Sequence, residues 1–110
     1  MDKRTEQLER LLEKGPDSPT LRFGLGKAWL DEGDPARAAE HLQQAVALQA
    51  DYSAAWKLLG KALAQAGRTE DARVAYARGI EVAEGRGDIQ AAREMRVFAR
   101  RLEKGEPPTR

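Results

Sequence analysis

The chain has 110 residues, of which 41% are hydrophobic, 5% aromatic and 34% charged, so it fits one domain whose core is built mainly from Ala, Leu and Val. Its 19 basic and 18 acidic residues nearly cancel, which gives no overall electrostatic signal for a nucleic-acid-binding or membrane-surface protein. The lack of cysteine and the single histidine, His41, exclude disulfides, thiolate chemistry and a histidine-based metal cluster within one chain. No stretch has the apolar length of a membrane span or signal peptide, so we expect a cytoplasmic protein with no cofactor and no membrane contact.

Apolar residues recur with a helical period along the chain, and glycine or proline interrupts them at intervals. Ser18 or Asp17 can cap the second helix, and Thr69 is expected to cap the fifth. Gly33 and Gly67 are expected to end the second and fourth helices. Four of the expected helices cover about residues 3–14, Pro19 to Glu32, Ser53 to Ala66, and 88–103. The third starts at Asp34-Pro35 with an inward stripe that reaches Val46, and the fifth follows Thr69 with an inward stripe that reaches Ile80.

Two stretches of the chain repeat each other at an offset of 34 residues. Leu25-Gly26-Lys27-Ala28 falls on Leu59-Gly60-Lys61-Ala62, and Gly33 falls on Gly67. One offset that accounts for so many pairs is hard to obtain by chance, so we expect stacked helix pairs. The expected division is a single domain over residues 1–104, made of a half repeat at 3–16, repeats at 19–52 and 53–86 and a terminal helix at 88–103, followed by a disordered tail at 105–110.

Gly26 and Gly60 lie in the middle of predicted helices. A glycine there costs about 0.5–1 kcal/mol relative to alanine. Because the cost occurs twice, we expect a steric need: the second helix of each pair, through Ala38 or Ala72, approaches the bare Cα closely.

Both units carry the same residue types at the same spacing. The second unit has Trp56, Leu59, Gly60, Leu63, Ala72 and Tyr76, and the first has Leu25, Gly26, Trp29, Ala38, Leu42 and Ala45. This pattern resembles the tetratricopeptide repeat (TPR) family. The resemblance implies an all-α, right-handed α-solenoid of antiparallel helix pairs with about six helices. Arg22 stands where the family has its first Trp, and the last helix fits the pattern poorly, so it could instead follow the second-helix pattern from Gly87.

In the TPR family the first helix of each pair lines a concave groove, and the resemblance implies such a groove here. Phe23, Lys27 and Leu30 lie at i, i+4 and i+7 of one such helix, and the next unit repeats this spacing. Lysines beside apolar side chains suit an acidic or C-terminal segment with an apolar anchor, although the lysines could also serve only to keep the face soluble. The predicted groove residues are Thr20, Phe23, Lys27, Leu30, Tyr52, Lys57, Lys61 and Ala64.

Four other features have structural interpretations that we prefer. The Gly-Lys pairs at Gly26 and Gly60 lack the remaining residues of a phosphate-binding loop. His41 is expected to be an exposed histidine with no partnered acid. Arg86-Gly87-Asp88 spells an adhesion tripeptide, but we expect it to be a loop and a helix cap. The basic arc of the last helix is expected to be a solvated face without bound nucleic acid, and comprises Arg93, Arg96, Arg100 and Lys104.

The sequence therefore predicts a protein–protein interaction scaffold or adaptor and not an enzyme. Its partner would be a protein or peptide segment, acidic in character, held in the concave groove. The alternative, from a different functional class, is a structural subunit that self-associates through its solenoid ends. The truncated N-terminal helix would then be the weak point, and the chain would form a weak homo-oligomer instead of a monomer.

Overall fold

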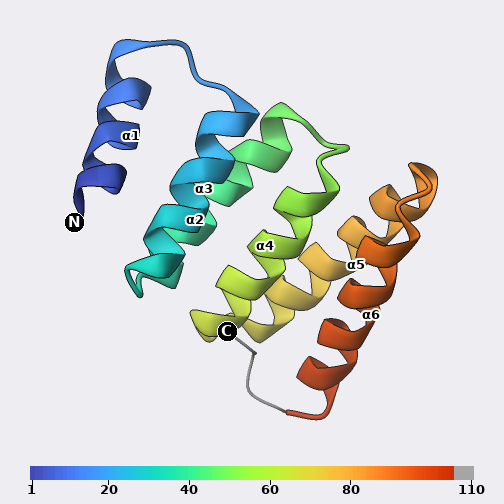
Figure 1. Cartoon of the computed structure of the whole chain (residues 1–110). Helices are drawn as coiled ribbons and strands as arrows, with labels where there is room; N and C mark the ends of the chain where they lie inside the picture. The colour runs from blue at the N-terminus through green and yellow to red at the C-terminus, as the bar shows by residue number, and fades with distance from the viewer. Residues whose placement is uncertain (106–110) are drawn as a thin grey trace.

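The computed structural model describes residues 1–105, which form six α-helices and no strand within that range (Figure 1). The expected all-α fold with six helices is confirmed. Of the tail expected at 105–110, only Gly105 belongs to the described residues, and it forms a turn. The helices are α1 (Lys3–Lys14), α2 (Pro19–Asp31), α3 (Pro35–Leu48), α4 (Ser53–Gln65), α5 (Thr69–Gly85) and α6 (Ile89–Glu103).

The helices stack as antiparallel pairs along one direction, with α1 and α6 at the two ends (Figure 1). The α2–α3 and α4–α5 pairs, here called unit one and unit two, pack most extensively within themselves. Across units, α2 contacts α4 and α4 contacts α6. The helices α2, α4 and α6 therefore form one layer of the solenoid, while α3 and α5 belong to the other. Because α6 contacts α4 as α4 contacts α2, it takes a first-helix position and not the second-helix position that the sequence left open.

The constant offset of 34 residues does not extend to α6. Ser53 begins α4 34 residues after Pro19 begins α2, but Ile89 begins α6 36 residues after Ser53. The cause is α5, which has 17 residues where α3 has 14. In the corrected register Met95 corresponds to Leu59, and both side chains are fully buried.

Side-chain caps begin several helices. The Ser18 hydroxyl accepts from the Leu21 amide at 3.0 Å, and Asp34 and Asp88 cap α3 and α6 in the same way. The expected cap at Thr69 is wrong, because Thr69 is the first helical residue of α5 and Arg68 precedes it without a side-chain cap.

The physical reason lies in the turn between α4 and α5. Gly67 takes the same left-handed conformation as Gly33, with φ of 80°, so Arg68 takes the N-cap position that Asp34 holds in unit one. Two acidic side chains in the first turn of α5, Glu70 and Asp71, complement the helix dipole instead.

The two mid-helix glycines mark close approaches within the helix pairs. A Cβ atom on Gly26 would collide with the Leu42 side chain, and one on Gly60 would collide with the Tyr76 ring. The expected close packing is therefore present. The nearest atoms belong to Leu42 and Tyr76, one helical turn beyond Ala38 and the equivalent alanine of unit two, which we had expected to make the approach.

Candidate functional site

The layer formed by α2, α4 and α6 contains the predicted groove residues. Phe23 of α2 packs against Tyr52, which precedes α4, with 5.1 Å between the ring centroids. Both rings are half-buried, and burial raises the pKa of the Tyr52 hydroxyl. Thr20 and Lys27 are exposed, so unit one presents a small aromatic cluster beside a solvated ammonium group.

The predicted residues on α4 are less available than those on α2. The Lys57 ammonium group lies 3.3 Å from the Glu94 carboxylate of α6, and the two side chains are 35% and 42% exposed. Lys61 is half-buried and Ala64 is buried. Glu94 was not predicted, because the sequence pattern provided no register of the last helix against α4. The cationic character of this face therefore rests more on Lys27 and Lys61 than on Lys57.

The helix α6 also adds residues to this layer. In the corrected register Arg93 corresponds to Lys57, Val97 to Lys61 and Arg100 to Ala64. Arg93 and Arg100 are exposed, and Val97 is 38% exposed. The residues of the basic arc predicted on the last helix therefore lie in two places. Arg93 and Arg100 lie on the same layer as Lys27 and Lys61. Arg96 instead pairs with Glu84 of α5.

A chain of polar contacts joins α1 to unit one. The Arg22 guanidinium donates to both Asp17 carboxylate oxygens at 2.9 Å and to His41 Nδ1 at 3.0 Å. An arginine cannot accept a hydrogen bond, so Nδ1 is the acceptor and Nε2 carries the proton toward Glu9 Oε2, 3.2 Å away. The same Glu9 oxygen accepts from the Trp29 indole at 2.9 Å. The Arg22 guanidinium holds the pKa of the Asp17 carboxyl below its usual range.

The expectation of an exposed histidine is therefore wrong. The His41 side chain is only 13% exposed, because α1 lies beside α2 and brings Glu9 over the imidazole. Both ring nitrogens have partners within the fold, so His41 holds helices together. The sequence could have indicated the contact between Glu9 and His41 only if the position of α1 against unit one had been known.

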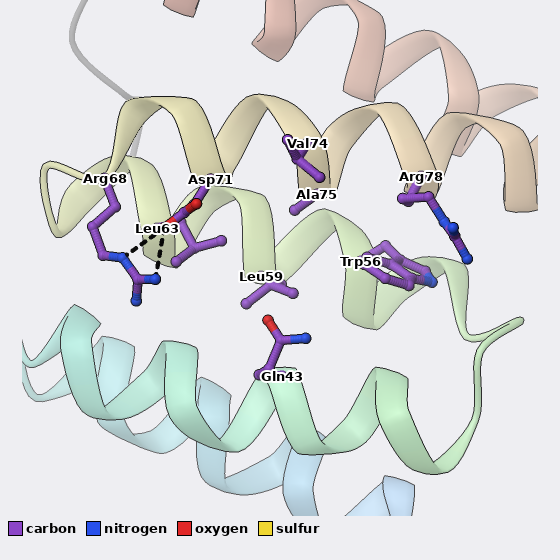
Figure 2. Close-up of a pocket in the computed structure, with 9 residues that line it drawn as sticks. All are labelled: Gln43, Trp56, Leu59, Leu63, Arg68, Asp71, Val74, Ala75 and Arg78. Carbon is purple, nitrogen blue, oxygen red and sulfur yellow. Dashed lines mark hydrogen bonds and ion pairs between the residues drawn. The ribbon is translucent and has the colours of Figure 1, made fainter.

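The corresponding place in unit two is an open cleft between α3 and α5, floored by α4 (Figure 2). Its volume is ≈ 440 Å³. Arg68 and Asp71 are bonded to each other at one end, and Arg78 lies beside Trp56 at the other (Figure 2). Sequence reasoning missed this cleft. Its lining residues are Gln43, Trp56, Leu59, Leu63, Arg68, Asp71, Val74, Ala75 and Arg78.

A second, smaller cleft of ≈ 300 Å³ lies between α5 and α6, at the end of the solenoid. Val74, Ile80 and Ala99 give it an apolar lining, with charged side chains around them. At the opposite end Leu11 of α1 is 58% exposed. Both ends of the solenoid therefore present some apolar surface.

The tripeptide Arg86-Gly87-Asp88 has a structural role, as expected. The Arg86 guanidinium donates to the Asp51 carbonyl, and Asp88 caps α6 and accepts from the Ser53 hydroxyl. Among residues 1–105 no group of three or more His, Cys, Asp or Glu side chains is placed to hold a metal ion. None of the helices in this range is long and apolar enough to cross a membrane.

Comparison with known proteins agrees with this architecture. A family profile described as tetratricopeptide repeat matches residues 30–95, and a second one matches residues 6–51. A TPR repeat-containing protein of Pseudomonas aeruginosa is 54% identical over 99 residues, which cover 90% of this chain and 94% of that protein.

Two solved structures are similar over most of the chain. The solution structure of a protein from Bordetella parapertussis has a TM-score of 0.80 and 41% identity, and covers 96% of this chain and 91% of that one. The crystal structure of a tetratricopeptide repeat domain protein from Salinibacter ruber has a TM-score of 0.73 and 30% identity. The match covers 81% of this chain and 100% of that one. Domains of this kind generally mediate protein–protein interactions. The profiles, the relatives and the stacked helix pairs agree, and the chain belongs to the tetratricopeptide-repeat family.

Proposed function

We propose that the protein is an adaptor that binds an acidic peptide segment across α2, α4 and α6. The observation that carries this proposal is the juxtaposition of the half-buried Phe23–Tyr52 pair with cationic side chains on the same layer. An aromatic pair provides an anchor for an apolar side chain, and ammonium groups attract carboxylates. Lys27 and Lys61 contribute charge from α2 and α4, and Arg93 and Arg100 extend it onto α6.

The electrostatic part should be modest. Exposed ion pairs contribute about 0–1 kcal/mol each and weaken with salt. Reversing both Lys27 and Lys61 to Glu should therefore weaken binding by roughly tenfold without abolishing it. Lys57 is a poor choice for this test, because a glutamate there would face Glu94 and destabilise the α4–α6 contact.

The test uses a fluorescently labelled acidic peptide with one phenylalanine, and a neutral version with amides in place of carboxylates. Fluorescence anisotropy at low and high salt measures both affinities. We expect the acidic peptide to bind more tightly, and the Lys27→Glu/Lys61→Glu variant to lose that preference. The matched control reverses Arg10 and Lys14, which are exposed on α1, outside this layer. The proposal fails if the α1 variant loses binding while the groove variant keeps it.

Self-association through the solenoid ends is the second candidate function. It is favoured by the exposed Leu11 at one end and by the apolar cleft between α5 and α6 at the other. Sedimentation velocity at two protein concentrations separates the candidates. The adaptor predicts a monomer at both concentrations, while end-to-end association predicts a sedimentation coefficient that rises with concentration and returns to the monomer value in Leu11→Glu.

A further inference from the structure

The cleft of unit two lies on the layer of second helices, away from the face to which we assign the acidic peptide. Leu59 and Leu63 form its floor and are almost completely buried, while Ala75 contributes a small side chain to one wall. Trp56 is half-buried at one end. The floor and walls come from three helices of the rigid stack, so the cleft is formed before any ligand binds (Figure 2).

In unit one the position equivalent to this cleft is filled by side chains of the protein itself. At the offset of 34 residues Trp29 corresponds to Leu63 and His41 to Ala75. Their two rings occupy the place and meet the Glu9 carboxylate, which comes from the neighbouring helix α1. In unit two both rings are absent, and the volume that they would fill is open.

The charges of the open cleft are unbalanced toward positive. The Asp71 carboxylate is bonded by Arg68 at 2.9 and 2.6 Å and so is already neutralised. The Arg78 guanidinium lies 5.7 Å from the Trp56 ring centroid, and no carboxylate among residues 1–105 pairs with it. Its N–H donors can therefore still receive an anion while its flat face stays on the indole.

At the mouth of the cleft one apolar side chain, Val74, stands at an exposed position where a polar residue would be expected. Val74 is 60% exposed, and unit one has Glu40 at the equivalent position. A valine that is 60% exposed on a helix buries little apolar surface within the fold, but it would lose contact with water when a ligand side chain enters the cleft. The amide of Gln43 stands on the opposite wall (Figure 2).

We infer that this cleft is a second binding site, for a segment of a partner protein that presents one apolar side chain next to a carboxylate. The apolar side chain lies on Leu59 and Leu63 beneath Val74, and the carboxylate receives hydrogen bonds from Arg78. This pairing of a ring with a neighbouring carboxylate reproduces in trans the arrangement that Trp29 and Glu9 make in unit one. The site is independent of the groove formed by α2, α4 and α6.

The smallest probe with both groups is 3-phenylpropionate, and its neutral analogue 3-phenylpropanamide isolates the charge. Titration followed by ¹⁵N–¹H NMR spectra locates each probe on the intact chain. We expect saturable shifts of the backbone amides that line the cleft on α4 and α5. For so small a ligand the dissociation constant should be on the order of millimolar. The neutral analogue should bind the same place roughly three- to fivefold more weakly.

Matched variants test the two contacts. Arg78→Gln should bring the affinity for 3-phenylpropionate down to that for the amide and leave the amide itself unaffected. Arg73→Gln, which removes an exposed arginine of the same helix outside the cleft, should change neither affinity. Val74→Glu, which introduces the residue type of unit one, should weaken 3-phenylpropionate further by repulsion. All three positions are exposed, so the fold should tolerate each change.

Three results would overturn the inference. The first is a set of shifts confined to α2 and α6, or no saturable shift in the cleft at all. The second is an equal effect of Arg78→Gln and Arg73→Gln on the affinity for 3-phenylpropionate. The third is a concentration-dependent shift of the cleft amides without any probe, because a second copy of the chain would then be the occupant.

Discussion

Units one and two follow the same chain path but hold their helices together by different means. At unit one Glu9 of the neighbouring helix α1 forms a hydrogen-bonded chain with His41 and Arg22. At unit two the corresponding residues are Gln43 of the neighbouring helix α3, with Ala75 and Trp56, and no such chain connects them. The Trp56 indole instead donates to the backbone carbonyl of Ala50 at 2.8 Å.

The difference follows from what lies beside each unit. The half repeat α1 packs against α2 less extensively than the helices within a unit pack against each other, and its Leu11 remains exposed. Charged and polar partners compensate by fixing α1 in one orientation. Unit two packs extensively against α6, and its polar contacts with that helix are separate pairs such as Lys57–Glu94 and not a connected chain. The same repeat can therefore be stabilised by polar contacts at an end and by apolar packing in the middle.

The largest effect should come from crowding the tight helix pair of unit two. Gly60→Leu forces a side chain against the Tyr76 ring, and the resulting strain should lower the free energy of unfolding by about 3 kcal/mol despite better helix propensity. Urea unfolding followed by circular dichroism measures the change. Gly85→Leu is the control, because a Cβ atom on Gly85 meets nothing within 4 Å, and its stability should be unchanged or slightly raised. Equal stability of both variants would contradict the close-packing account.

A smaller loss should follow from breaking the polar chain of unit one. Glu9→Ala leaves the Trp29 indole N–H and the His41 Nε2–H without their acceptor, and the unfolding free energy should fall by about 1–2 kcal/mol. Gln43→Ala removes the α3 residue that lies beside unit two as Glu9 lies beside unit one; Gln43 is exposed, and its loss should change stability by less than about 0.5 kcal/mol. If the two variants are equally stable, α1 is not held by this chain of contacts.

Acid should loosen unit one before unit two. The Asp17 pKa is lowered in the folded state, so the ionised carboxylate stabilises the fold above its ordinary pKa. That contribution is lost as the pH falls through the ordinary carboxyl range, near about pH 4, toward the lowered folded-state pKa. Hydrogen exchange, corrected for intrinsic rates, should show α1 and α2 losing protection at a higher pH than α4.

Matched amide variants decide whether Asp17 causes this effect. Asp17→Asn should remove part of the pH dependence of α1 and α2. Asp51→Asn changes the equivalent residue before α4, whose carboxylate lies 3.6 Å from an exposed arginine. This variant should keep the full pH dependence of α1 and α2. An identical response of both variants would assign the acid sensitivity to other groups, such as Glu32, whose pKa is lowered chiefly by the Thr5 hydroxyl.

The smallest effect on stability should come from Val74→Glu. Unit one has Glu40 at this position, and Val74 is 60% exposed, so the unfolding free energy should stay within about 0.5 kcal/mol. Thermal unfolding at equal protein concentration measures it. A clear loss of stability would show that Val74 serves the fold, and would remove the reason to regard it as part of a binding cleft.

The sequence by itself determined the repeated elements of this protein. Helical periodicity and the paired Gly33 and Gly67 were enough to predict six helices, because both signals are local, and the offset of 34 residues predicted that the helices stack in pairs. The close approaches at Gly26 and Gly60 were predicted as well, since a repeated energetic cost within a helix needs a steric reason. The predicted partner of each glycine was nevertheless one helical turn away from the side chain in contact.

Only the tertiary structure decided which side chains make contact between neighbouring repeats. The longer α5 changes the register of α6, so Glu94 meets Lys57 and the arginines of α6 join the lysine face. The burial of His41 depends on Glu9, 32 residues earlier in the chain. The cleft of unit two exists because Leu63 and Ala75 are both small where unit one has two rings. Each of these outcomes depends on side chains far apart in sequence. A repeat pattern gives the spacing of residues within a unit, but it does not give the side chains that a neighbouring helix places against that unit.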